Sequence, residues 1–151
     1  EVQNNLIKNH NIPKNKTLIF RNIVDEEKFY SERPLSPSPK SVLIYSNRMQ
    51  DEQRHFIMQV CDELGMSCEL LGGKYGQILQ HELRKKINAH DIVFSLGRGV
   101  IETMLCGRIP IVFDYLGGDG MVPPEVFQSM ATTNFSGRLK SRFYTNEELK
   151  R

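Results

Sequence analysis

The chain has 151 residues, of which 39% are hydrophobic and 25% charged, and a formal net charge of +2 at pH 7. This length suits one domain with its own core, and so small a charge does not indicate a nucleic-acid partner. No apolar run is long enough to cross a membrane and the N-terminal residues show no signal-peptide pattern, so we expect a cytoplasmic location. Any membrane association would then come through other parts of a longer protein.

The first 40 residues look different from the rest. Residues 1–16 resemble the last turns of a helix, and residues 17–20 form a short strand candidate. Three prolines fall within Ser31 to Lys40, which is typical of a linker or surface crossing, although an ordinary loop within one domain fits equally well. We therefore expect residues 1–40 to be the tail of a preceding domain plus a linker, and residues 41–151 to be one packed domain.

Beyond residue 40, short β-branched or aromatic runs alternate with stretches whose apolar residues recur at helical spacing. This alternation predicts an α/β fold with a doubly wound, Rossmann-like parallel sheet. The predicted strands are Val42–Tyr45, Ser67–Leu71, Ile92–Phe94 and a run ending at about Tyr115, and the predicted helices are Asp51–Leu64, Gln77–Asn88, Val100–Leu105, one reaching about Ala131 and one from Asn146.

A tight glycine turn, Gly97-Arg98-Gly99, follows the third of these strands. Two glycines one residue apart let a phosphate approach the backbone, and the amides that begin the next helix attract anions. Arg98 adds a positive charge at the same place. The turn is therefore a candidate phosphate cradle, with a structural turn and nothing more as the alternative.

Glu102 lies among apolar neighbours in the first turn of the following helix. A dinucleotide-binding fingerprint would have a glycine at this position and its ribose-binding acid about 20 residues later, so the segment is not a standard NAD motif. A simple preference of negative charge for a helix N-terminus is the alternative explanation.

Two further segments are expected at the same edge of the sheet, where ligands of such folds bind. Arg48 and Lys74 follow the first two strands, either as phosphate contacts or as solvated loop charges. Gly118, Asp119 and Gly120 follow the last strand, and we expect them to form a flexible turn on the same rim.

Cysteine and histidine spacing predicts no metal site. Cys61, Cys68 and Cys106 form no CxxC pair and lie within apolar segments, which indicates buried thiols in a reducing compartment. The four histidines are isolated from one another and from the cysteines.

The segment GRGVIETMLCGRIPIVFDY resembles the C-terminal, donor-binding domain of group-one glycosyltransferases, which have two facing Rossmann-like domains (the GT-B fold). This group includes many polysaccharide and lipopolysaccharide transferases. RNIVDEEKF is similar to the segment with which these enzymes leave their N-terminal domain, and GGDGMVPPEVF with NFSGR is similar to the tail of a bacterial subgroup. The resemblance covers roughly residues 17–140.

The resemblance implies transfer of a hexosyl group from a nucleotide-diphosphate sugar to a saccharide or lipid-linked acceptor, without a metal or other cofactor. It implies that Glu102 accepts hydrogen bonds from the ribose hydroxyls and that the backbone from Gly97 to Gly99 lies near the diphosphate. Arg48 is implied to balance the leaving-group charge.

The sequence departs from the family pattern in two ways. Phe94 stands where the family has a glutamate facing the donor sugar, so the catalytic residue is unassigned. The partner domain that binds the acceptor is missing, so we expect this chain alone to bind nucleotide weakly and to transfer little or no sugar. A non-catalytic nucleotide-binding module and a nucleotide-sugar epimerase of similar architecture remain as alternatives.

Overall fold

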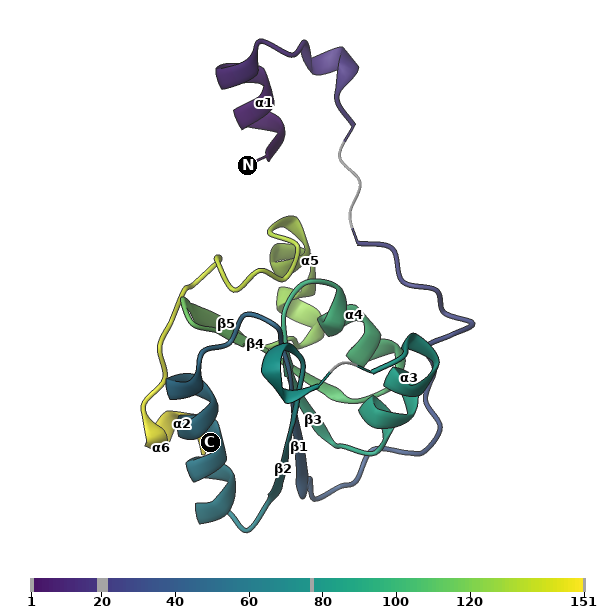
Figure 1. The fold of residues 1–151 in the computed structure, drawn as a ribbon, viewed down its shortest axis with the longest axis vertical. Coiled ribbons are helices and arrows are strands. Elements are labelled where there is room, and N and C mark those ends of the chain that lie inside the picture. The colour runs from purple at the N-terminus through teal and green to yellow at the C-terminus, as the bar shows by residue number, and fades with distance from the viewer. Residues whose placement is uncertain (1, 19–21, 77, 151) are drawn as a thin grey trace.

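The chain folds around one five-stranded sheet, and the computed structural model describes residues 2–18, 22–76 and 78–150 (Figure 1). The strands lie in the order β2-β1-β3-β4-β5. The first four are parallel, and β5 runs antiparallel to β4. Their bounds are Ser41–Tyr45 for β1, Ser67–Leu71 for β2, Ile92–Ser95 for β3, Ile109–Asp114 for β4 and Gly117–Met121 for β5.

Helices cover both faces of the sheet (Figure 1). Val42 and Ile44 of β1 pack with Ile57 of α2, whereas Leu43 between them packs with Leu83 of α3. Alternate residues of a strand point to opposite faces, so a strand buried on both sides is apolar throughout. The helices are α2 (Asp51–Glu63), α3 (Gln80–Asn88), α4 (Arg98–Leu105), α5 (Pro124–Thr132) and α6 (Asn146–Leu149).

The predicted α/β class and the four parallel strands are confirmed, as are the helices between them within a few residues. Helix α3 begins at Gln80, and its predicted first residue, Gln77, lies outside the described residues. Thr17 and Leu18 are not in a strand, and the rest of the strand predicted at 17–20 lies outside the described residues. Helix α1 (Val2–His10) stands apart from the sheet (Figure 1).

The predicted flexible turn at Gly118–Gly120 is wrong, because these residues belong to β5. A Cβ on Gly118 would overlap the carbonyl oxygen of Val112 and lie 2.8 Å from the Cα of Phe113. The two backbones therefore approach closely at the irregularity in register between Val112 and Phe113. Glycine, which looks like a turn signal in the sequence, is what allows this strand to pair.

Part of the segment before residue 41 packs against the sheet. Phe29 is 1% exposed and joins the core beside Leu43. Arg33 pairs with Asp91 at 2.8 Å, and Arg108 donates a hydrogen bond to the Arg33 carbonyl. The division of the chain at residue 41 stays a prediction, but these contacts fix the proline-rich segment to the body that follows it.

The chain order places a switch point between β1 and β3. From β1 the chain runs out to β2 on one side and then returns to β3 on the other side. At such a reversal the connections leave in opposite directions, which opens a crevice beyond the carboxyl ends of the two strands. A ligand site is therefore expected at the residues that follow Tyr45 and Ser95.

Candidate functional site

A hollow of about 1140 Å³ lies at this switch point. It is lined by residues 45–48 at the end of β1 and beyond it, residues 95–99 at the end of β3 and beyond it, residues 131–134 around the end of α5, and Ser136 and Arg138. Residues of the N-terminal segment, among them Leu6 and Thr17, also border it. The hollow therefore lies where the topology of the sheet favours ligand binding.

Four of the predicted site residues meet in this hollow: Arg48, Gly97, Arg98 and Gly99. Arg48 comes from the loop after β1, and the other three come from the turn into α4. Glu102 does not line the hollow, because it is 2% exposed and paired with Arg98. Gly118, Asp119 and Gly120 do not line it either, since they form β5.

The two glycines of the turn are explained by packing within the protein. Gly97 has φ 56°, and its amide donates to the carbonyl of Phe135 at 2.9 Å. A Cβ on Gly99 would overlap Oγ of Ser95 and lie 2.9 Å from Cε1 of Tyr45. Gly99 thus lets α4 approach β1 and β3 closely, and the Gly97 amide is already occupied. A bound anion would have to rely mainly on side chains.

Glu102 and Arg98 form an ion pair across one turn of α4. Nε of Arg98 donates to Oε1 of Glu102 at 2.7 Å, while Oε2 of Glu102 has no hydrogen-bond partner among the described residues. Burial raises the pKa of Glu102, and the positive charge of Arg98 offsets only part of this effect. Burial and the neighbouring carboxylate raise the pKa of Tyr45 to about 12. The buried carboxylate beneath the turn therefore has one oxygen, Oε2, that could accept a further hydrogen bond.

Arg48 is exposed and makes no side-chain hydrogen bond or ion pair within the described part of the chain. Its backbone position is well fixed, because its amide donates to Oγ of Ser46 at 3.1 Å. Arg54 of α2, which is 3% exposed, donates to the carbonyls of Ser46 and Met49 at 2.5 and 3.1 Å. The loop after β1 thus holds a free cation on a rigid backbone.

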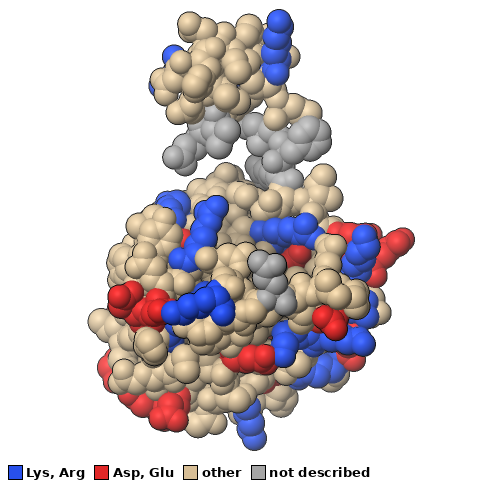
Figure 2. Space-filling view, viewed as in Figure 1, with Lys and Arg blue, Asp and Glu red and all other residues tan. Residues whose placement is uncertain are grey.

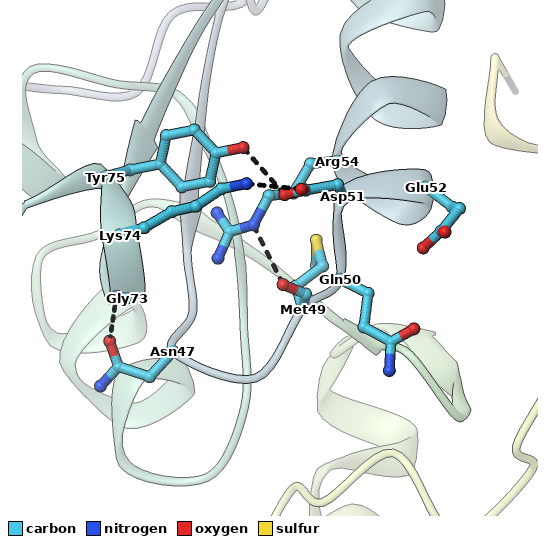
Figure 3. A pocket seen from close by; sticks show the side chains of 9 residues that line it. All are labelled: Asn47, Met49, Gln50, Asp51, Glu52, Arg54, Gly73, Lys74 and Tyr75. Carbon is cyan, nitrogen blue, oxygen red and sulfur yellow. Dashed lines mark hydrogen bonds and ion pairs between the residues drawn. The ribbon is translucent and has the colours of Figure 1, made fainter.

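A second, smaller hollow of about 440 Å³ adjoins the same loop (Figure 3). Lys74 and Tyr75 both contact Asp51 there, at 2.5 and 2.9 Å, and the Arg54 guanidinium lies 4.7 Å from the centre of the Tyr75 ring. Asn47 accepts a hydrogen bond from the Gly73 amide at 2.7 Å. Lys74, which follows β2, is thus ion-paired with Asp51, the first residue of α2, and it does not line the larger hollow.

Sequence reasoning missed Arg138 as a residue of the hollow. Its guanidinium donates to both carboxylate oxygens of Asp114, at 3.3 Å each. Asp114 is the buried last residue of β4. Arg138 belongs to the NFSGR segment, which the sequence relates to the glycosyltransferase resemblance but not to a pocket. Asp119 anchors the next part of this tail, since it accepts from the Lys140 amide at 2.7 Å.

On the face shown in Figure 2, basic and acidic side chains are interspersed.

Among residues 2–18, 22–76 and 78–150 there is no cluster of three His, Cys, Asp or Glu side chains suited to a metal ion. Within the same ranges no helix has the length and apolar character that crossing a membrane requires.

Comparison with protein-family models, with curated proteins and with solved structures finds no match for this chain. The fold is an α/β fold with a mostly parallel sheet, compatible with a Rossmann-like domain. Any functional proposal therefore depends on the hollow and on the residues that line it.

Proposed function

We propose that the hollow between the ends of β1 and β3 binds a nucleotide-diphosphate sugar, and that the chain is the donor-binding part of a GT-B glycosyltransferase. The observation that carries the proposal is the meeting of Arg48, from the loop after β1, and Arg98, from the start of α4, in one hollow, with Arg98 paired to the buried carboxylate of Glu102. The sequence resemblance in the Asp91–Tyr115 segment supports the same function.

The two arginines suit a diphosphate. A guanidinium is always charged and donates hydrogen bonds in a fork that matches phosphate oxygens. Arg48 has no competing partner among the described residues, and Arg98 is 48% exposed. In sugar transfer, the bond from the anomeric carbon to the diphosphate breaks and negative charge grows on the leaving oxygen, so cations placed there stabilise the transition state.

Glu102 suits the ribose of the same ligand. A carboxylate can accept hydrogen bonds from both hydroxyls of a diol, and one of its oxygens is unpartnered in the structure. No acid occurs in β3, and none of the described residues that line the hollow is an aspartate or glutamate. The share of the reaction that falls to this chain is therefore donor binding and stabilisation of the leaving group.

Isothermal titration with UDP, GDP, ADP and NAD tests the proposal. We expect saturable binding of one nucleoside diphosphate and a loss of about tenfold in affinity, roughly 1.4 kcal/mol, in Arg48→Ala. Arg142→Ala is the matched control, because Arg142 pairs with Glu148 away from the hollow. Preference for NAD, or no binding of any nucleotide, would contradict the proposal.

A further inference from the structure

Arg98 covers the carboxylate that would hold the ribose. The Arg98 side chain lines the hollow and is 48% exposed, whereas the Glu102 side chain is 3% exposed and lies outside the lining. The pair joins Nε to Oε1 at 2.7 Å. A ligand in the hollow therefore meets Arg98 first and reaches Glu102 only after Arg98 has moved.

The pairing leaves Glu102 incompletely satisfied. Its Oε2 atom is buried without a partner among the described residues. Burial keeps the pKa of this carboxyl raised in spite of the adjacent guanidinium. The Tyr45 hydroxyl also interacts with this carboxylate and lowers its pKa, as Arg98 does, but neither effect cancels that of burial. Two hydroxyl donors from a diol, in place of the one Nε–H group of Arg98, would give the carboxylate the partner that Oε2 lacks.

Arg98 itself has little that holds it in place. It is the first residue of α4, directly after Gly97, and no other side-chain hydrogen bond of Arg98 is found among the described residues. A change of side-chain rotamer turns the guanidinium from Glu102 toward the hollow without moving the helix. A diphosphate in the hollow offers it a stronger, bidentate partner.

We infer that Arg98 determines specificity by requiring a ligand that carries an anionic diphosphate and a ribose diol together. The diphosphate draws Arg98 away from Glu102, and the diol takes the place that Arg98 leaves. A nucleoside alone has to displace Arg98 without compensation, and a diphosphate alone leaves Glu102 buried and unpaired. This inference rests on the proposed function and adds to it a residue that rejects partial ligands.

The test compares whole and partial ligands on the same protein. Wild type, Arg98→Ala and Arg98→Gln are titrated with UDP, GDP and ADP, with uridine, guanosine and adenosine, and with inorganic pyrophosphate. For both variants we expect affinity for the nucleoside diphosphate to fall at least tenfold and affinity for the matching nucleoside to rise severalfold. These opposite changes in the two affinities distinguish the proposed role of Arg98 from a loss of structure, because an unfolded variant would bind every ligand more weakly.

Arg48→Ala is the matched control, since Arg48 borders the same hollow but does not touch Glu102. Arg48→Ala is expected to lower the affinity for the nucleoside diphosphate and to leave the affinity for the nucleoside unchanged. Adding Glu102→Gln to Arg98→Ala should abolish the gain in nucleoside affinity.

If wild type binds a nucleoside diphosphate but neither Arg98 variant gains affinity for the nucleoside, the inference is wrong and the proposed function stands. If wild type binds no nucleoside diphosphate, both are overturned. The circular dichroism spectrum and the melting temperature of each variant identify those that have lost structure, and Arg98→Gln keeps a side chain of similar length on α4.

Discussion

Arg138 and Asp114 tie the C-terminal segment to the end of β4 through two hydrogen bonds of 3.3 Å. Asp114 is fully buried, while the Arg138 side chain is 32% exposed and borders the hollow. The hydrogen bonds to Asp114 raise the pKa of Arg138. The pair therefore positions one wall of the hollow and neutralises Arg138. Arg98 is likewise paired, with Glu102, so among the described arginines that line the hollow only Arg48 has no ion-pair partner.

Removing Arg138 should destabilise the fold. Among the described residues, the buried carboxylate of Asp114 in Arg138→Ala keeps only the hydrogen bond from the Leu116 amide, and we expect a loss of about 2 kcal/mol in the free energy of unfolding. Urea denaturation measures this loss. Arg142→Ala removes an ion pair between the exposed Arg142 and the half-buried Glu148 and should cost less than about 1 kcal/mol. Equal losses in the two variants would show that the buried pair has no special role.

Asp91 should make stability depend on pH in the acid range. It accepts hydrogen bonds from the Lys40 amide, Ser41 and Arg33. Burial alone would raise the pKa of Asp91, but these bonds outweigh it and hold the pKa at about 2, below the ordinary value of 3.8. Because the folded pKa is lowered, the stabilisation is present above about pH 4 and is lost as pH falls toward 2.

Asp91→Asn is therefore expected to be less stable than wild type by about 2 kcal/mol at pH 7, with the difference closing near pH 2. Urea denaturation at a series of pH values measures it. Asp62→Asn on the exposed side of α2 is the control, since its carboxylate makes no hydrogen bond among the described residues. A difference that stays constant with pH would contradict the role given to Asp91.

The core of the fold follows from the sequence because the alternation of apolar runs is unambiguous between residues 41 and 114. Strands β1 and β3 are buried on both faces or nearly so, the edge strand β2 is partly buried, and helix α2 shows one apolar side. Local patterns of this kind depend on few distant contacts. The meeting of Arg48 with the glycine turn also followed from strand ends sharing one edge of the sheet.

Other features depend on contacts between distant residues and could not be predicted in this way. Strand β5 is glycine-rich because its backbone lies against Val112 and Phe113, which no local propensity reveals. Phe29 enters the core from the stretch before the proline-rich segment, which the sequence indicates to be outside the packed domain. The hydrogen bond from the Gly97 amide to the Phe135 carbonyl joins residues 38 positions apart. The glycine motif alone therefore could not predict that this amide already has a partner.

Gly99 should tolerate no side chain while Ser95 and Tyr45 keep their places. An added Cβ overlaps Oγ of Ser95 and lies 2.9 Å from the Tyr45 ring. Gly99→Ala should therefore lose about 1–3 kcal/mol of stability through overpacking. In the double variant Gly99→Ala, Ser95→Ala part of the loss should be recovered, because the closer of the two clashes is gone. Additive losses in denaturation experiments would rule out this packing role.

Glu102 should reduce stability at neutral pH. Its folded pKa is raised, chiefly by burial, so the protonated form is the one that folding favours. The stabilisation from that proton is fully present below about pH 4.5 and is lost as pH rises through the folded pKa. Glu102→Gln, which has no charge to bury, should be more stable than wild type at pH 7, and the difference should shrink as pH falls below 4.5.

The same variant should lose affinity for the nucleoside diphosphate, because an amide can accept from only one of the two ribose hydroxyls and must donate to the other. Gain of stability with loss of binding is the pattern expected of a residue kept for function at a cost to the fold. Thermal melts at pH 4 and pH 7 together with titration of the diphosphate measure both quantities. Glu125→Gln, on the exposed first turn of α5, should change neither. A Glu102→Gln variant that is less stable at pH 7 and binds as wild type does would make Glu102 a structural partner of Arg98 and nothing more.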